Sequence, residues 1–140
     1  MPEKDGLIMA FDFGLRHIGV AVGQPVTQQA RGVSTVLAKA GKPQWRDIRQ
    51  LIQVYDPRQL VVGLPLNMDG SESEMTDHAR TFAQRLGNQT GLPVALQDER
   101  LTSHAAAPHV ETAHALGEAE TDHELAAVLI GEAYLESNPR

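Results

Sequence analysis

Acidic residues stand at the ends of two strand-like segments that are far apart in the sequence. Asp12 lies near the end of the apolar run 7–13, and Asp98 and Glu99 end the run in "LPVALQDER". In an open α/β sheet the working crevice lies beyond the carboxyl ends of the parallel strands. If these two segments flank the strand in "QLVVGLP", they stand two strand spacings apart, roughly 9–10 Å. Carboxylates meeting there would repel one another without a cation. The arrangement therefore predicts oxygen ligands for Mg²⁺ or Mn²⁺.

Gly63, on the strand between them, has no side chain to fill the space in which such a site would form. Each acid also has a purely structural explanation. Asp12 could accept backbone N–H bonds in the following turn, as Asp often does. Glu99 could form a surface ion pair with Arg100 or Arg16, which would contribute little. The residues alone leave these alternatives open, and the two acids together favour the metal site.

The elements that must position these acids follow from the apolar pattern. Residues 7–13, 18–22 and 33–38 are typical of strands, and tight turns between them favour antiparallel pairing. Two later strands, in "QLVVGLP" and "LPVALQDER", are each preceded by a segment with helical spacing, which favours right-handed parallel crossovers. We therefore expect an α/β fold in one domain, residues 1–140, with a five-stranded mixed sheet and helices on both faces.

Helix boundaries are also visible in the sequence. The segment "PQWRDIRQLIQVYDP" has apolar residues at helical spacing and ends at Asp56-Pro57. The next helix is expected to place Met75, Phe82 and Leu86 on one side and to end by Gly91. The last helix should open with Thr121 and Glu124 as a capping box. Asp122, in its first turn, would on these grounds alone complement the helix dipole.

Charge and composition narrow the possible partners. The net charge of −6 argues mildly against nucleic acid, but six of the twelve basic residues lie between positions 31 and 58. That stretch is a candidate surface for a polyanion, with two solvated faces of opposite sign as the alternative. The absence of cysteine excludes thiolate metal sites. A charged N-terminus and the lack of a long apolar run predict a cytoplasmic protein without a membrane segment.

Four segments resemble, in order, the motifs of the YqgF/RuvX family. "DFGLRHIGVA" is similar to its opening motif, Asp-x-Gly-x-Lys/Arg-x-Ile-Gly-Val-Ala. "VVGLPLNMDG" and "DERLTS" are similar to the central and third motifs, and "LAAVLIGEAYL" resembles the closing helix. The resemblance implies an RNase H-like fold. It also implies membership of a family of cytoplasmic pre-16S rRNA nucleases, earlier described as Holliday junction resolvases.

This resemblance assigns roles to individual acids. Asp12 and Glu99 match the family's first two acidic positions. The third position, usually Asp, is occupied here by His123, with Asp122 one residue earlier. Either Asp122 replaces the usual acid through a local shift, or His123 serves as a nitrogen ligand, or the site is weakened. We take Asp12, Glu99 and Asp122 as the expected catalytic residues and metal ligands, with His123 as a further candidate ligand.

The expected activity is Mg²⁺- or Mn²⁺-dependent phosphodiester hydrolysis in the 5′-end maturation of small-subunit ribosomal RNA. Arg16 and Arg100 would face the scissile phosphate, because guanidinium matches phosphate geometry. Their alternative is ion pairing with Glu99 or Asp98. We expect a monomer or weak homodimer that binds structured or precursor ribosomal RNA. Two other functions remain open: a symmetric dimer resolving branched DNA junctions, and a non-catalytic RNA-binding assembly factor.

Overall fold

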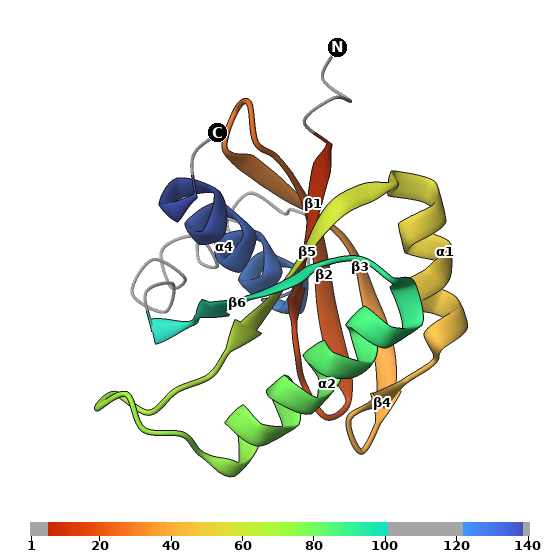
Figure 1. Ribbon diagram of the computed structural model, residues 1–140. Helices are drawn as coiled ribbons and strands as arrows, with labels where there is room; N and C mark the ends of the chain where they lie inside the picture. Colours follow the sequence, from red (N-terminus) through yellow and green to blue (C-terminus); the bar gives the residue numbers. More distant parts are fainter. Residues whose placement is uncertain (1–5, 101–121, 139–140) are drawn as a thin grey trace.

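A computed structural model describes residues 6–100 and 122–138 of the chain (Figure 1). The strands are β1 (Leu7–Asp12), β2 (His17–Gln24), β3 (Gln29–Lys39), β4 (Lys42–Pro43), β5 (Pro57–Leu64) and β6 (Val94–Asp98). The helices are α1 (Trp45–Tyr55), α2 (Glu74–Thr90) and α4 (Asp122–Ser137). The predicted capping residue Thr121 lies outside the described residues.

One sheet contains all the strands, in the order β4-β3-β2-β1-β5-β6. The β1–β2, β2–β3 and β3–β4 pairs are antiparallel, whereas β5 runs parallel to both β1 and β6. The predicted mixed sheet is confirmed, with β1 and β6 on either side of β5. The predicted count of five strands was one too low. The additional strand, β4, has two residues, too few to give a periodic pattern, and it forms because the chain reverses at Gly41 (φ 81°).

Side chains alternate between the two faces of the sheet along β1. Met9 and Phe11 belong to the large core beneath α1 and α2, whereas Ile8 and Ala10 pack with α4. Figure 1 shows α1 and α2 covering one face and α4 the other. Asp12 comes two residues after Ala10 and therefore continues on the α4 face.

Helix α2 has well-defined ends. Ser73 accepts the backbone N–H of Thr76, and the Thr76 hydroxyl accepts the backbone N–H of Ser73, which completes a capping box. The Thr76 hydroxyl is buried and also donates to the Pro65 carbonyl, so it ties the helix to the loop after β5. The helix stops at Gly91, as predicted, where φ is 71°. None of the helices in the described ranges is long and apolar enough to cross a membrane.

Candidate metal-binding active site

Asp12 and Glu99 meet at the carboxyl edge of the three parallel strands. Asp12 is the last residue of β1. Glu99 follows β6 directly, and its N–H donates to the carbonyl of Leu64 at the end of β5 (3.1 Å). Their side chains hydrogen-bond to each other across the end of β5. The fold thus brings two acids that are far apart in the sequence into direct contact.

Gly63 provides the space for this contact. A Cβ atom at this position would lie 2.9 Å from Cγ and 3.0 Å from Cδ of Glu99, and would overlap Cδ1 of Ile130 on α4. The Glu99 side chain therefore crosses β5 over the glycine. The space that the sequence analysis expected at Gly63 is occupied by the side chain that reaches Asp12.

Burial and mutual repulsion change the acidity of both carboxyl groups. The pKa of Glu99 is raised from 4.5 to about 8, first because burial penalises its charged form and then because the negative charge of Asp12 lies beside it. The pKa of Asp12 is also raised, chiefly by burial, although the Glu99 hydrogen bond and the His123 side chain oppose that effect. In the metal-free chain at neutral pH, Glu99 therefore keeps its proton and donates it to the Asp12 carboxylate.

The first turn of α4 lies beside this pair. Gly19 on β2 pairs with Asp12 in the β1–β2 ladder, and a Cβ atom on Gly19 would overlap the backbone carbonyl of His123. The His123 ring stacks on the ring of His17, with centroids 4.8 Å apart and an interplanar angle of 15°. Glycine on β2 therefore lets α4 approach the sheet closely, at the point where Asp12 ends β1.

The structure assembles only part of the expected ligand set. Asp122 and His123 are both exposed at the start of α4. Within residues 6–100 and 122–138, no three His, Asp or Glu side chains gather closely enough to form a metal-binding group. His17 was not singled out from the sequence. Its position immediately after the turn that follows Asp12 could have indicated it.

The two candidate arginines have different surroundings. Arg100 donates from Nη2 to Asp98 Oδ2 (2.8 Å) and from Nη1 to the carbonyl of Met68 (3.2 Å). Its charge lowers the pKa of Asp98 through the hydrogen bonds and the ion pair. Arg100 thereby ties the end of β6 to the loop that contains Met68. Arg16, by contrast, is exposed in the turn between β1 and β2.

The sequence profile of the RuvX family, which is described as "Holliday junction resolvase", matches residues 6–137. The chain belongs to the RuvX family. A relative from Haemophilus ducreyi is 45% identical over 135 residues, which cover 94% of this chain and 97% of the relative. A relative from Pseudomonas paraeruginosa is 52% identical over 100 residues, 71% of this chain and 69% of the relative. Both are named "Putative pre-16S rRNA nuclease".

Solved structures extend the RuvX-family likeness at the level of the fold. Thermus thermophilus RuvC in complex with a Holliday junction substrate has a TM-score of 0.59 at 16% identity, covering 94% of both chains. The fowlpox virus Holliday junction resolvase has a TM-score of 0.54 at 12% identity, covering 94% of this chain and 98% of the resolvase. The RNase H-like fold expected from the sequence is therefore confirmed.

Proposed function

We propose that this RuvX-family chain is a divalent-metal-dependent nuclease that cleaves phosphodiester bonds in precursor 16S ribosomal RNA in the cytoplasm. The observation that carries the proposal is the contact between Asp12 and Glu99 at the carboxyl edge of the parallel strands. Relatives at 45% and 52% identity carry the corresponding nuclease name. We take these relatives as support for RNA as the substrate.

The paired carboxyl groups suit a hard divalent ion such as Mg²⁺ or Mn²⁺. Both provide oxygen donors, and Gly63 leaves room for Glu99 to reach Asp12. In the absence of an ion, the proton on Glu99 relieves the repulsion between the two carboxylates, as a bound cation would. When bound, such an ion lowers the pKa of an attacking water and neutralises charge on the phosphate. Asp12 and Glu99 would hold it, with Asp122 or His123 reaching it from α4.

The other residues of this edge would position the substrate. Arg16 is exposed on the turn after Asp12 and can contact a phosphate oxygen of the incoming strand. Arg100 is held by Asp98 and Met68, and we assign it to fixing the loop after β5. Its contribution to phosphate binding would therefore be indirect.

Cleavage assays with matched substrates test the proposal. Wild type, Asp12→Asn and Asp56→Asn proteins are incubated with precursor 16S RNA or four-way junction DNA, with Mg²⁺ or Mn²⁺. Asp56 lies after α1, at the opposite edge of the sheet, and its replacement removes the same charge. We expect RNA cleavage by wild type and Asp56→Asn and none by Asp12→Asn.

Three other outcomes would refute the proposal in different ways. Cleavage of the junction alone, by a protein whose mass in solution is that of a dimer, indicates a resolvase. Equal RNA binding by wild type and Asp12→Asn, with no cleavage by either, indicates an assembly factor. Cleavage that persists in Asp12→Asn removes the assigned site.

The third ligand is tested at α4. If His123 is the ligand, the His123→Ala variant should be inactive and the Asp122→Asn variant active. If Asp122 is the ligand, Asp122→Asn should be inactive and His123→Ala active. If the site is weakened because the usual acid is absent, His123→Asp should raise the cleavage rate. Lack of any effect from all three changes would exclude the start of α4 from the metal site.

A further inference from the structure

A cavity lies near the end of β1, as Asp12 does, but on the face of the sheet that α1 and α2 cover. It has a volume of about 170 Å³ and is lined by the residue after β1, the β3–β4 turn, the start of β4, α1 and α2. We call it the α2-side pocket. The residues that matter to its chemistry are Phe13, Lys42, Trp45, His78 and Arg85.

The charged groups of the α2-side pocket are all potential cations. Lys42 and Arg85 are exposed, and neither forms an ion pair with another residue in the described part of the chain. His78 lies 3.9 Å from Glu74 on the same helix. Among the described residues, no carboxylate lines the pocket, and Thr81 adds a hydroxyl. Two uncompensated basic side chains around one cavity suit a phosphate group.

An aromatic surface accompanies these charges. The Trp45 ring stacks on Phe82, with centroids 5.9 Å apart and an interplanar angle of 12°. The Phe82 ring in turn packs against the ring of Phe13, with centroids 5.2 Å apart. Trp45 is partly buried against the core and also lines the cavity, so part of its ring is accessible there. Cations beside a supported aromatic ring are the combination that binds unpaired nucleotides.

The α2-side pocket and the proposed active site lie on opposite faces of the sheet, just where β1 ends. Asp12 and Phe13 are consecutive residues, one on the α4 face and the other in the pocket. The N–H of Gly41, in the β3–β4 turn, donates to the carbonyl of Leu15 in the β1–β2 turn (2.9 Å). The two turns are therefore joined, and Arg16 is exposed on them. A nucleic-acid strand that crosses these turns can reach both places.

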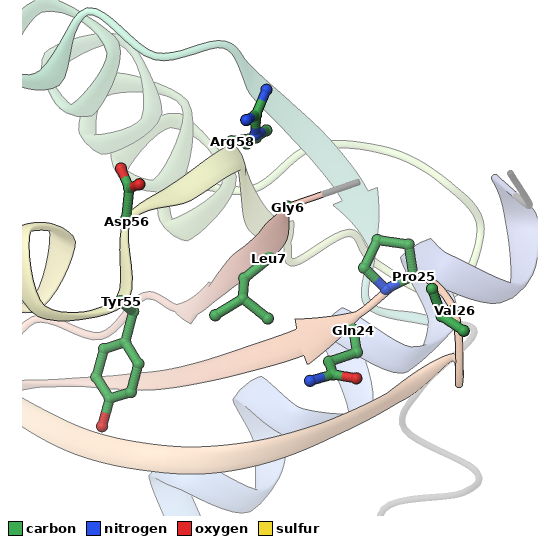
Figure 2. Close-up of a pocket in the computed structure, with 8 residues that line it drawn as sticks. All are labelled: Gly6, Leu7, Gln24, Pro25, Val26, Tyr55, Asp56 and Arg58. Carbon is green, nitrogen blue, oxygen red and sulfur yellow. The ribbon is translucent and has the colours of Figure 1, made fainter. Parts of the chain in front are cut away.

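A larger cavity in the described part of the chain lacks this chemistry. It has a volume of about 380 Å³ and lies at the opposite edge of the sheet, beside the starts of β1 and β5 (Figure 2). Its charged residues are one acid, Asp56, and one base, Arg58, and Figure 2 shows both side chains pointing away from Leu7 and Gln24. This cavity therefore provides a location for control substitutions.

We propose that the α2-side pocket binds one unpaired nucleotide of the RNA strand that passes through the active site, with its phosphate on Lys42 and Arg85 and its base on Trp45. The inference rests on the proposed nuclease function and extends it to a preference for a single-stranded flank. It predicts that a substrate with an unpaired extension binds more tightly than a blunt duplex of the same sequence.

The single tryptophan of the chain makes the pocket directly observable. Wild-type protein in EDTA, where metal-dependent cleavage cannot occur, is titrated with a ten-nucleotide oligoadenylate while Trp45 fluorescence is recorded. We expect saturable quenching, because the adenine base stacks on the indole. Tripolyphosphate, which has charge but no base, should not quench. No quenching by the oligonucleotide, or equal quenching by tripolyphosphate, would overturn the assignment of the base to Trp45.

Charge substitutions test the phosphate contact. The double variant Lys42→Gln/Arg85→Gln should bind the oligonucleotide about tenfold more weakly, and the slope of log K against log salt should fall by about 0.7, the contribution of one phosphate contact on a single strand. Arg85→Gln alone should also weaken binding. Its control, Arg80→Gln, removes the same charge on α2 from a side chain that pairs with Glu72, and it should change neither value. Equal losses in Arg85→Gln and Arg80→Gln would refute the pocket and indicate non-specific attraction.

This outcome is separable from that of the nuclease assay. If quenching is seen but no RNA is cleaved with Mg²⁺ or Mn²⁺, the pocket remains as an RNA-binding site and the nuclease assignment fails. If RNA is cleaved and Lys42→Gln/Arg85→Gln leaves KM for a substrate with an unpaired flank unchanged, the nuclease stands and the pocket is refuted.

Discussion

Replacing Glu99 by Gln tests the central feature of the site without requiring knowledge of the substrate. In the metal-free protein Glu99 has a pKa of about 8 against an ordinary value of 4.5, because it is buried beside Asp12. The folded chain therefore binds one more proton than the unfolded chain between these two pH values. Stability should fall as the pH rises through this range and level off above pH 8. Glutamine cannot ionise, and its amide N–H can donate to Asp12 as the protonated acid does.

The magnitude follows from the two pKa values. The difference between about 8 and 4.5 corresponds to a ceiling of about 5 kcal/mol, since one pH unit is worth about 1.4 kcal/mol. Relaxation of the side chain and entry of water reduce the cost of burying a charged group. We therefore expect the free energy of unfolding of Glu99→Gln to be about 2 kcal/mol higher than that of wild type at pH 8.5. At pH 4.5 the two proteins should be nearly equal in stability.

Urea unfolding in EDTA, followed by circular dichroism from pH 4.5 to 8.5, measures this difference. Glu136→Gln, near the exposed end of α4, removes the same charge and serves as the control. Its stability should follow that of wild type at every pH. If Glu99→Gln also follows wild type across the range, Glu99 is not buried beside Asp12, and the paired site is refuted.

Three further changes test how the site is built, each by urea unfolding at neutral pH. Gly63→Ala should cost about 1–3 kcal/mol and weaken Mn²⁺ binding, because the new methyl group takes the space of the Glu99 side chain; unchanged Mn²⁺ affinity, by calorimetry, would contradict this. Gly19→Ala should cost about 3 kcal/mol or more, since the overlap is with the rigid backbone of His123; a loss under 1 kcal/mol would mean that α4 can move away. Thr76→Val should cost about 1–2 kcal/mol, because the Thr76 hydroxyl no longer accepts the Ser73 N–H or donates to the Pro65 carbonyl in the loop after β5, whereas no loss would show that both bonds are replaceable.

The central strands could be predicted because burial on both faces makes their sequences continuously apolar. The runs 7–13 and 60–64 are of this kind, and the helical segment before the second run predicted a parallel crossover. Strand β3 is longer than predicted, Gln29–Lys39 instead of 33–38. Its first four residues, Gln29, Ala30, Arg31 and Gly32, are all exposed or half-buried and do not form an apolar run, so their pairing with β2 depends on tertiary contacts that no local pattern reveals.

The position of the candidate site could be predicted from the strand pattern, but the directions of its side chains could not. Asp98 and Glu99 are neighbours at the end of β6, and consecutive side chains in an extended segment point to opposite sides. The strand pattern alone could not tell which of them turns towards Asp12, whereas the resemblance to the YqgF/RuvX motifs indicated Glu99. In the structure it is Glu99, while Asp98 binds Arg100. Arg100 also contacts the carbonyl of Met68, a backbone atom whose position depends on the folded loop.

The pairing of Asp12 with Glu99 requires β1, β5 and β6 to lie side by side, and β6 is the last of the three to be synthesised. A nascent chain that has left the ribosome only as far as β5 contains Asp12 but no partner for it. Such a chain would lack the acidic pair on which the proposed nuclease depends. The pair would thus form only after β6 has been synthesised and has folded beside β5.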